Sequence, residues 1–256
     1  MSWLWCDNRI DSILECNKRF YDENYVIITI FKFYSELCEN RSSRLSFESC
    51  SDRGILLFRN VSAMTVTLGQ HLLNSQFSLI PSSDHQPNNL YEKFIKPLTI
   101  LLEVIHRNLS AEYVNFGMMR LYKDDSLDQM LKIFLDLLIN KIAASETLLE
   151  YPESASQVYL ILDHLVEDHI DWMVNLDESI WMCILWILKN GLVSNINTVQ
   201  TKSCSAIDNL ASHWRVVVFF FLSIIHFSAK KIKSPLTLSP SLHRISKEKN
   251  PRIIQH

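Results

Sequence analysis

The sequence predicts an all-α fold, and three observations support this prediction. The chain has 256 residues, of which 48% are hydrophobic and 21% are charged, so it can bury a substantial core. It contains only four glycines and seven prolines, too few for a sheet with many tight turns. Apolar residues recur at three- and four-residue steps in successive segments, which is the spacing of one helix face. We therefore expect helices joined by polar loops.

The clearest helical segment runs from Leu127 to Ile142. Its apolar residues lie along one face, at Leu127, Met130, Leu131, Phe134, Leu138 and Ile142. Ser126 and Gln129 have the spacing of a capping box at its start. We expect this helix to pack against an earlier one.

That earlier helix carries the stripe Leu98, Leu101, Leu102, Ile105 and Leu109. The chain enters it through Asn89 and Glu92. Pro97 either kinks the helix or marks its first turn, because proline lacks the backbone N–H that an interior position requires.

Further helices are expected at about 22–38, 55–73, 154–168, 177–189 and 198–213, with Ser154 and Gln157 as a second capping box. Most of them are apolar around more than half of their circumference, which indicates middle layers of a stack. The connections 39–51, 74–89 and 110–125 are long and unequal. Helix starts therefore follow no strict period, and internal repetition alone does not establish a repeat array.

The glycines exclude several classes of enzyme. They lie at Gly54, Gly69, Gly117 and Gly191, so neither a phosphate-binding glycine-rich loop nor a nucleophile elbow can form. We expect no catalytic site and no cofactor.

One His/Asp cluster raises the question of a metal site. It comprises His164, His169, Asp163, Asp168 and Asp171, and imidazole with carboxylate suits zinc or iron. Residues five apart on a helix point roughly 140° away from each other, unlike the four-residue step of H-E-x-x-H. We expect no metal site, but solvated residues at a helix end and a hydrogen-bonded histidine.

Two apolar blocks need an interpretation. The block from Trp181 to Leu188 spans about three turns, so we expect a buried helix. The run Val216–Phe227 lies between Arg215 and the pair Lys230–Lys231, as a membrane anchor would. It is shorter than the roughly 20 apolar residues of a membrane span, which favours a core helix or non-native peptide. A partly inserted segment is the alternative.

Charge is unevenly distributed along the chain. Residues 229–256 contain seven basic residues and one acidic residue, a balance of +6 within a total of −3. The rest carries −9, which discourages nucleic-acid binding and suits basic partners. The basic tail, with three prolines, has the composition of a disordered segment. The six scattered cysteines indicate buried, reduced thiols of an intracellular protein.

A resemblance to a known family rests on the segment Tyr113–Asp128, which reads YVNFGMMRLYKDDSLD. Lesser matches agree in order: NRSSRLSF at 40–47, GILLFR at 54–59, LEYP at 149–152, EDH at 167–169 and IDNLA at 207–211. Together they cover about 20–213. The chain resembles the exportin-7 (Ran-binding protein 16/17) group of the importin-β superfamily of nuclear transport receptors.

The resemblance implies an α-solenoid of HEAT-type antiparallel helix pairs, forming an incomplete superhelix. It implies residues 1–213 as a HEAT segment from the middle-to-C-terminal part of a longer receptor, followed by a divergent apolar segment, 214–228, and a basic tail, 229–256. Members bind protein cargo together with Ran-GTP, contact Phe-Gly nucleoporins and shuttle between nucleus and cytoplasm, without doing chemistry. The Ran-binding end of such receptors is absent from the match.

The segment Tyr113–Asp125 is the expected partner-binding site. We expect Gly117 to break it and the side chains of Tyr113, Phe116, Leu121 and Tyr122 to anchor it on neighbouring helices. Arg120, Asp124 and Asp125 then remain for partners, together with Tyr122. The alternative is that Arg120 pairs with the local acids and only fixes a loop.

Two functions from different classes remain open. The first is a transport-receptor segment that mediates Ran-GTP-dependent export by reversible cargo binding. The second is a HEAT scaffold without transport activity that associates with a membrane through 216–227.

Overall fold

The computed structural model describes residues 24–39, 52–77, 90–110, 114–142 and 146–214. The chain divides into two units, Met1–Leu210 and Ala211–His256, and 211–214 are the described part of the second. Every regular element in the described ranges is a helix, so the predicted all-α class is confirmed.

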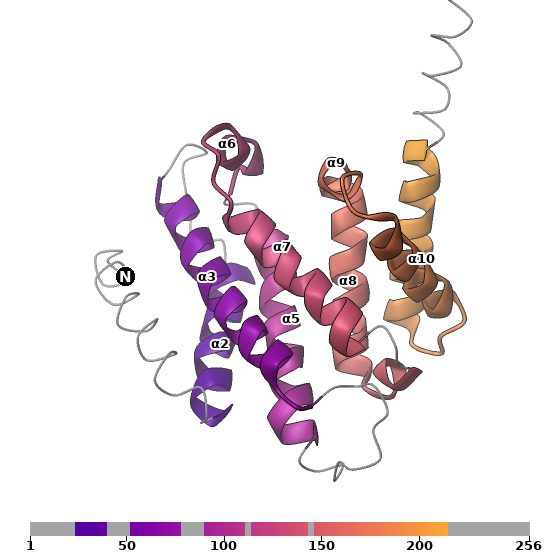
Figure 1. The fold of residues 1–256 in the computed structure, drawn as a ribbon, viewed down its shortest axis with the longest axis horizontal. Helices are drawn as coiled ribbons and strands as arrows, with labels where there is room; N and C mark the ends of the chain where they lie inside the picture. Colours follow the sequence, from indigo (N-terminus) through magenta and orange to yellow (C-terminus); the bar gives the residue numbers. More distant parts are fainter. Residues whose placement is uncertain (1–23, 40–51, 78–89, 111–113, 143–145, 215–256) are drawn as a thin grey trace, which may run out of the picture. The chain divides into compact units, whose positions relative to one another are not determined.

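The helices of the first unit form two layers that alternate along the chain (Figure 1). In one layer, α5 (Lys96–Leu109) packs between α2 (Asn24–Glu39) and α8 (Pro152–Asp168). In the other, α3 (Asp52–Asn74) packs along α7 (Ser126–Leu137) and also contacts α5. Stacking of like helices from successive pairs is the arrangement of an α-solenoid, as predicted.

The predicted apolar stripes form the core. The side chains of Leu98, Leu101, Leu102 and Ile105 on α5 are completely buried, because this helix has neighbours on both sides. The expected main partner of α5, the helix after Ser126, instead packs mainly on α3. A smaller contact remains, with Asn108 Nδ2 lying 3.6 Å from Met130 Sδ.

A π-helical turn, η1 (Tyr91–Ile95), leads directly into α5. The N–H of Lys96 donates to the carbonyl of Tyr91, five residues back, and Pro97 follows in the first turn of α5. The shifted register of a π turn accommodates a residue that has no N–H to donate. Pro97 therefore marks a first turn inside a continuous helical run.

Gly69 allows α3 and α7 to approach closely. A Cβ at this position would lie 2.6 Å from Cγ1 of Ile133. Such a contact is far inside van der Waals distance, so a side chain here would push the two helices apart.

Both predicted capping boxes are wrong. The N-cap of α7 is Asp125, and the side chain of Gln129 donates to its Oδ2 at 2.7 Å. Helix α8 begins at Pro152, so Ser154 lies inside it, buried, with its Oγ 2.5 Å from Oγ1 of Thr99. Proline at the first position started α8 earlier than the serine signal indicated.

The prediction of a buried helix at 181–188 is only partly right. Helix α10 (Glu178–Leu192) buries Ile184, Ile187 and Leu188. Met182, Leu185 and Trp186 on its other face are 61%, 43% and 43% exposed. The block is apolar all round, so its composition could not show which face lacks a neighbour.

The remaining elements are short, except for a helix at 197–214. They are η2 (Leu138–Ile142), η3 (Glu146–Glu150), α6 (Phe116–Leu121) and α9 (Ile170–Met173). Helices η2 and α7 together match the predicted helix 127–142. Helix α6 lies within the predicted connection 110–125.

None of the helices that the structure describes is long and apolar enough to cross a membrane. The run 216–227 and the basic tail, 229–256, lie outside the described residues, as does the boundary between them. Their predicted roles stay predictions. Of the three described cysteines, Cys38 is buried as expected, Cys183 is half-buried, and Cys204 is exposed, contrary to the prediction.

Candidate partner-binding site

Helix α6 carries the segment that the sequence singled out. Asn115 caps it, its side-chain oxygen accepting from the N–H of Met118 at 3.2 Å. Gly117 lies inside the helix and does not break it, contrary to the prediction. The capping asparagine was the sequence signal for this helix, and the run of apolar residues after it was too short to be recognised.

An aromatic stack holds α6 between two distant parts of the first unit. The ring of Phe116 meets Phe58 of α3 at a centroid distance of 5.3 Å and His169, which follows α8, at 5.1 Å. Both contacts are edge-to-face, with interplanar angles of 77° and 79°. The predicted anchoring role of Phe116 is confirmed.

A tight turn ends α6 and presents two apolar side chains to solvent. The N–H of Tyr122 donates to Met118 and that of Asp124 to Met119, at 3.0 and 2.9 Å. Lys123 between them has a φ of 56°, a left-handed conformation common after helix ends. Leu121 and Tyr122 are 71% and 73% exposed, so their predicted anchoring roles are wrong. Tyr113 lies outside the described residues.

The two aspartates after the turn are held by the chain itself. Oδ2 of Asp124 lies 3.2 Å from Nε of Arg59 on α3, and Oδ1 accepts from the N–H of Ser126 at 3.0 Å. Asp125 accepts from Gln129. Asp124 thus fixes the turn against α3, and the sequence offered no signal that Arg59 would reach it.

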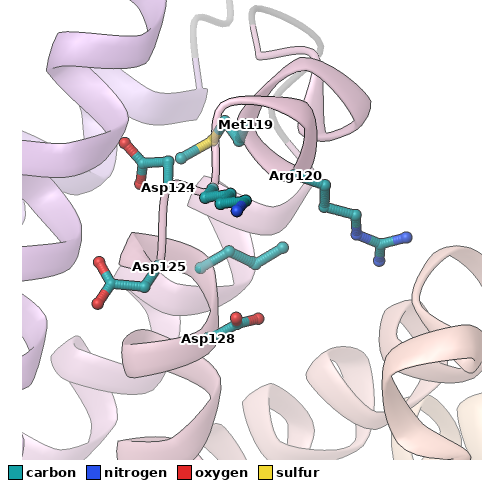
Figure 2. Close-up of a pocket in the computed structure, with 7 residues that line it drawn as sticks. Met119, Arg120, Asp124, Asp125 and Asp128 are labelled. Atoms are coloured by element: carbon teal, nitrogen blue, oxygen red, sulfur yellow. The ribbon is translucent and has the colours of Figure 1, made fainter.

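Arg120 points away from both aspartates, as Figure 2 shows. Within the described part of the chain it forms no ion pair, so the alternative in which it pairs with the local acids is wrong. The positive charge of Arg120 acts on His169. Burial is the main cause of the lowered pKa of His169; Asp168 raises this pKa, and Arg120 lowers it further.

A hollow of about 240 Å³ lies beside the turn. Its floor is Met119 and Leu127, which are buried, and charged side chains surround it: Arg120, Lys123, Asp124, Asp125 and Asp128 (Figure 2). The structure therefore brings three of the four predicted site residues to one hollow and places the fourth, Tyr122, on the adjoining turn. Such a surface is suited to binding and holds no nucleophile with an adjacent base.

The His/Asp cluster does not converge on one point. Asp163 pairs with Lys202 at 2.7 Å, and His164 Nδ1 lies 3.7 Å from Asp168. His169 is 2% exposed, and its buried Nδ1 has no hydrogen-bond partner among the described residues, so the hydrogen-bonded histidine expected near this helix end is not seen at that nitrogen. Among the described residues, no three histidine, cysteine or acidic side chains are grouped as a metal ion requires.

The fold and this surface define the class: a helical-repeat protein with a candidate surface for partners. Comparison with curated proteins gives 35% identity over 184 residues to exportin-7-B of Xenopus laevis, 72% of this chain and 16% of that protein. Ran-binding protein 17 of Homo sapiens is 32% identical over 219 residues, 86% of this chain and 18% of the relative. Ran-binding protein 16 of Drosophila melanogaster is 27% identical over 232 residues, which are 91% of this chain and 20% of the relative.

The resemblance to the exportin-7 (Ran-binding protein 16/17) group is therefore confirmed, and the chain is a partial-length relative of that group. It spans about a fifth or less of the length of these proteins. No family model matches the chain, and no solved structure matches it.

Proposed function

We propose that the chain is a segment of a nuclear transport receptor that mediates Ran-GTP-dependent protein export by reversible cargo binding. The observation that carries this proposal is the sequence similarity to exportin-7 and to two Ran-binding proteins over most of the chain. The stacked helix pairs support it, because a solenoid binds partners through extended surfaces. The receptor would shuttle through the nuclear pore, contact Phe-Gly nucleoporins and need no cofactor.

The α6–α7 corner, defined as residues 115–128, is the proposed partner surface. Arg120 and Tyr122 are exposed to solvent and make the contact. Asp125 lines the hollow at its rim, while Asp124, held by Arg59, keeps the turn in place. Loops fixed by a helical scaffold commonly carry binding residues.

Retention of Ran by the purified chain tests the transport function. The 256-residue chain is immobilised and incubated with Ran carrying a non-hydrolysable GTP analogue, and with Ran carrying GDP as the control. We expect the chain to retain more Ran carrying the GTP analogue than Ran carrying GDP. Where this retention depends on the α6–α7 corner, Arg120→Glu reduces the amount of Ran retained. Equal retention of the two forms, or retention of neither, overturns Ran-GTP-dependent export by this chain.

A further inference from the structure

Leu121 and Tyr122 are two adjacent large apolar side chains that stand in water at the end of α6. Exposing them forgoes the roughly 1.5–3 kcal/mol that burying each such side chain normally contributes. Single exposed apolar residues are ordinary, but neighbours on one tight turn form a protruding apolar tip. A partner that covers this tip gains the free energy that folding did not use.

The tip is held rigidly from below. The side chain of Met119 is 2% exposed. The backbone carbonyl of Met119 accepts the N–H of Asp124. Asp124 in turn pairs with Arg59, and Phe116 fixes the other end of α6 against Phe58. A tip that is already ordered loses little conformational entropy on binding, which favours affinity.

Charges surround the tip and define what can receive it. Arg120 and Lys123 lie beside it, with Asp125 and Asp128 across the hollow. This combination of an apolar centre, tyrosine and arginine with a charged rim is the composition of a protein-protein hot spot. These charges surround the apolar floor of the neighbouring hollow, so the same apolar tip from a second copy of the chain would have to desolvate them on entering it.

We propose that Leu121 and Tyr122 form an anchor that inserts into an apolar pocket on a folded protein partner. An acidic side chain of the partner faces Arg120, and a basic one faces Asp128. The proposal rests on the proposed function in so far as the chain acts by binding proteins. It adds Leu121 to the site and assigns Asp124 a positioning role.

Site-specific cross-linking tests the anchor. Benzoylphenylalanine replaces Tyr122 in the full chain, and in a control chain it replaces Tyr25 of α2, which is 83% exposed and lies away from the corner in sequence. Both chains are illuminated in nuclear extract, and mass spectrometry identifies any partner joined at position 122 only. That partner is then purified and titrated against variants of the chain.

We expect Tyr122→Ala and Leu121→Ala each to weaken binding of the purified partner by about tenfold or more, as for hot-spot residues. Tyr122→Phe retains the ring and most of the affinity, and Tyr25→Ala stays within about twofold of the wild type. Unchanged thermal melting of the variants shows that folding is not the cause. A partner that binds Tyr122→Ala as tightly as the wild type overturns the anchor.

Other outcomes of the cross-linking also decide the matter. The absence of a partner specific to position 122 overturns the proposal, as does a cross-link to a second copy of the chain. If Ran loaded with the GTP analogue is retained but no such partner is found, the anchor fails and the transport function stands. If a partner specific to position 122 is found but the chain does not retain Ran, the result supports the anchor and contradicts the transport function.

Discussion

Arg59 on α3 and Asp124 at the α6–α7 corner form an ion pair with Nε and Oδ2 3.2 Å apart. They lie 65 positions apart in the sequence, and their contact fixes the corner to the first helix pair. Arg59 is about half exposed, whereas the side chain of Asp124 is 13% exposed and also accepts the N–H of Ser126. The two residues should therefore differ in how much they contribute to stability.

Asp124→Ala is predicted to lower the free energy of unfolding by about 1–2 kcal/mol, because it removes the ion pair and the bond to the N–H of Ser126. Arg59→Ala removes only the pair and should cost under about 1 kcal/mol, as exposed pairs do. Urea unfolding of both variants and of the double variant measures the difference. Equal losses in the two single variants would show that Asp124 does not support the turn.

Gly191→Ala is predicted to destabilise the first unit by about 1–3 kcal/mol through overpacking. A Cβ at this position would overlap Oγ of Ser203 and the ring of Tyr159. That ring is held in place, because its hydroxyl donates to the carbonyl of Ile187 at 2.8 Å. A change in the thermal midpoint reports the loss.

Gly117→Ala is the matched control, since among the described residues the only close neighbour of its added Cβ is Oδ1 of Asn115 at 3.1 Å. Alanine gains up to about 1 kcal/mol over glycine in a helix, so this variant should be neutral or slightly more stable. A Gly191→Ala chain as stable as the Gly117→Ala chain would contradict the packing between α10 and its neighbours.

The predictable parts of this fold are those that a single helix determines. The stripe from Leu127 to Ile142 appears on α7 and η2, because its periodicity depends only on local geometry. Helix starts were less predictable. Asp125 rather than a serine caps α7, and α8 begins at Pro152, ahead of the serine that was expected to cap it. Around Trp186, the helix α10 is apolar on every face, so its composition could not show which face would be exposed.

The candidate site was predicted in location but not in arrangement. The aromatic stack joins Phe58, Phe116 and His169, which are far apart in the sequence. Such contacts follow from how helix pairs stack, and a single sequence carries no local signal for them. For the same reason, Leu121 and Tyr122, which were expected to pack inward, proved to be exposed.

Stability should depend on pH through His106. Its ring lies against that of His164 between α5 and α8, with the centroids 5.2 Å apart and the ring planes tilted by 36°. Burial, followed by the positive charges of His164, Arg107 and Lys202, lowers the pKa of His106 from 6.5 to about 4. Between these two values the unfolded chain binds more protons than the folded chain, so stability falls as the pH decreases from about 6.5 to about 4.

The loss attributable to His106 is on the order of 2 kcal/mol, after a discount for its partial exposure. His106→Gln cannot gain a proton and should therefore unfold with a weaker dependence on pH across this window. Urea unfolding at pH 7, 6, 5 and 4 compares the two chains. Parallel curves for the wild type and His106→Gln would mean that other groups carry the acid sensitivity.

The ion pair between Lys202 and Asp163 should show the asymmetry of buried charges. Nζ and Oδ2 are 2.7 Å apart, and the side chain of Asp163 is 2% exposed while that of Lys202 is 33% exposed. Lys202→Met leaves the carboxylate buried without its cation, which should cost about 3–5 kcal/mol. The double variant Lys202→Met with Asp163→Leu removes both charges, and we expect it to recover most of that loss. Urea unfolding of the single and double variants measures the two losses. If the double variant is no more stable than Lys202→Met alone, the pair does not stabilise the fold by compensating a buried charge. The stabilising effect then comes from the geometry of the two side chains.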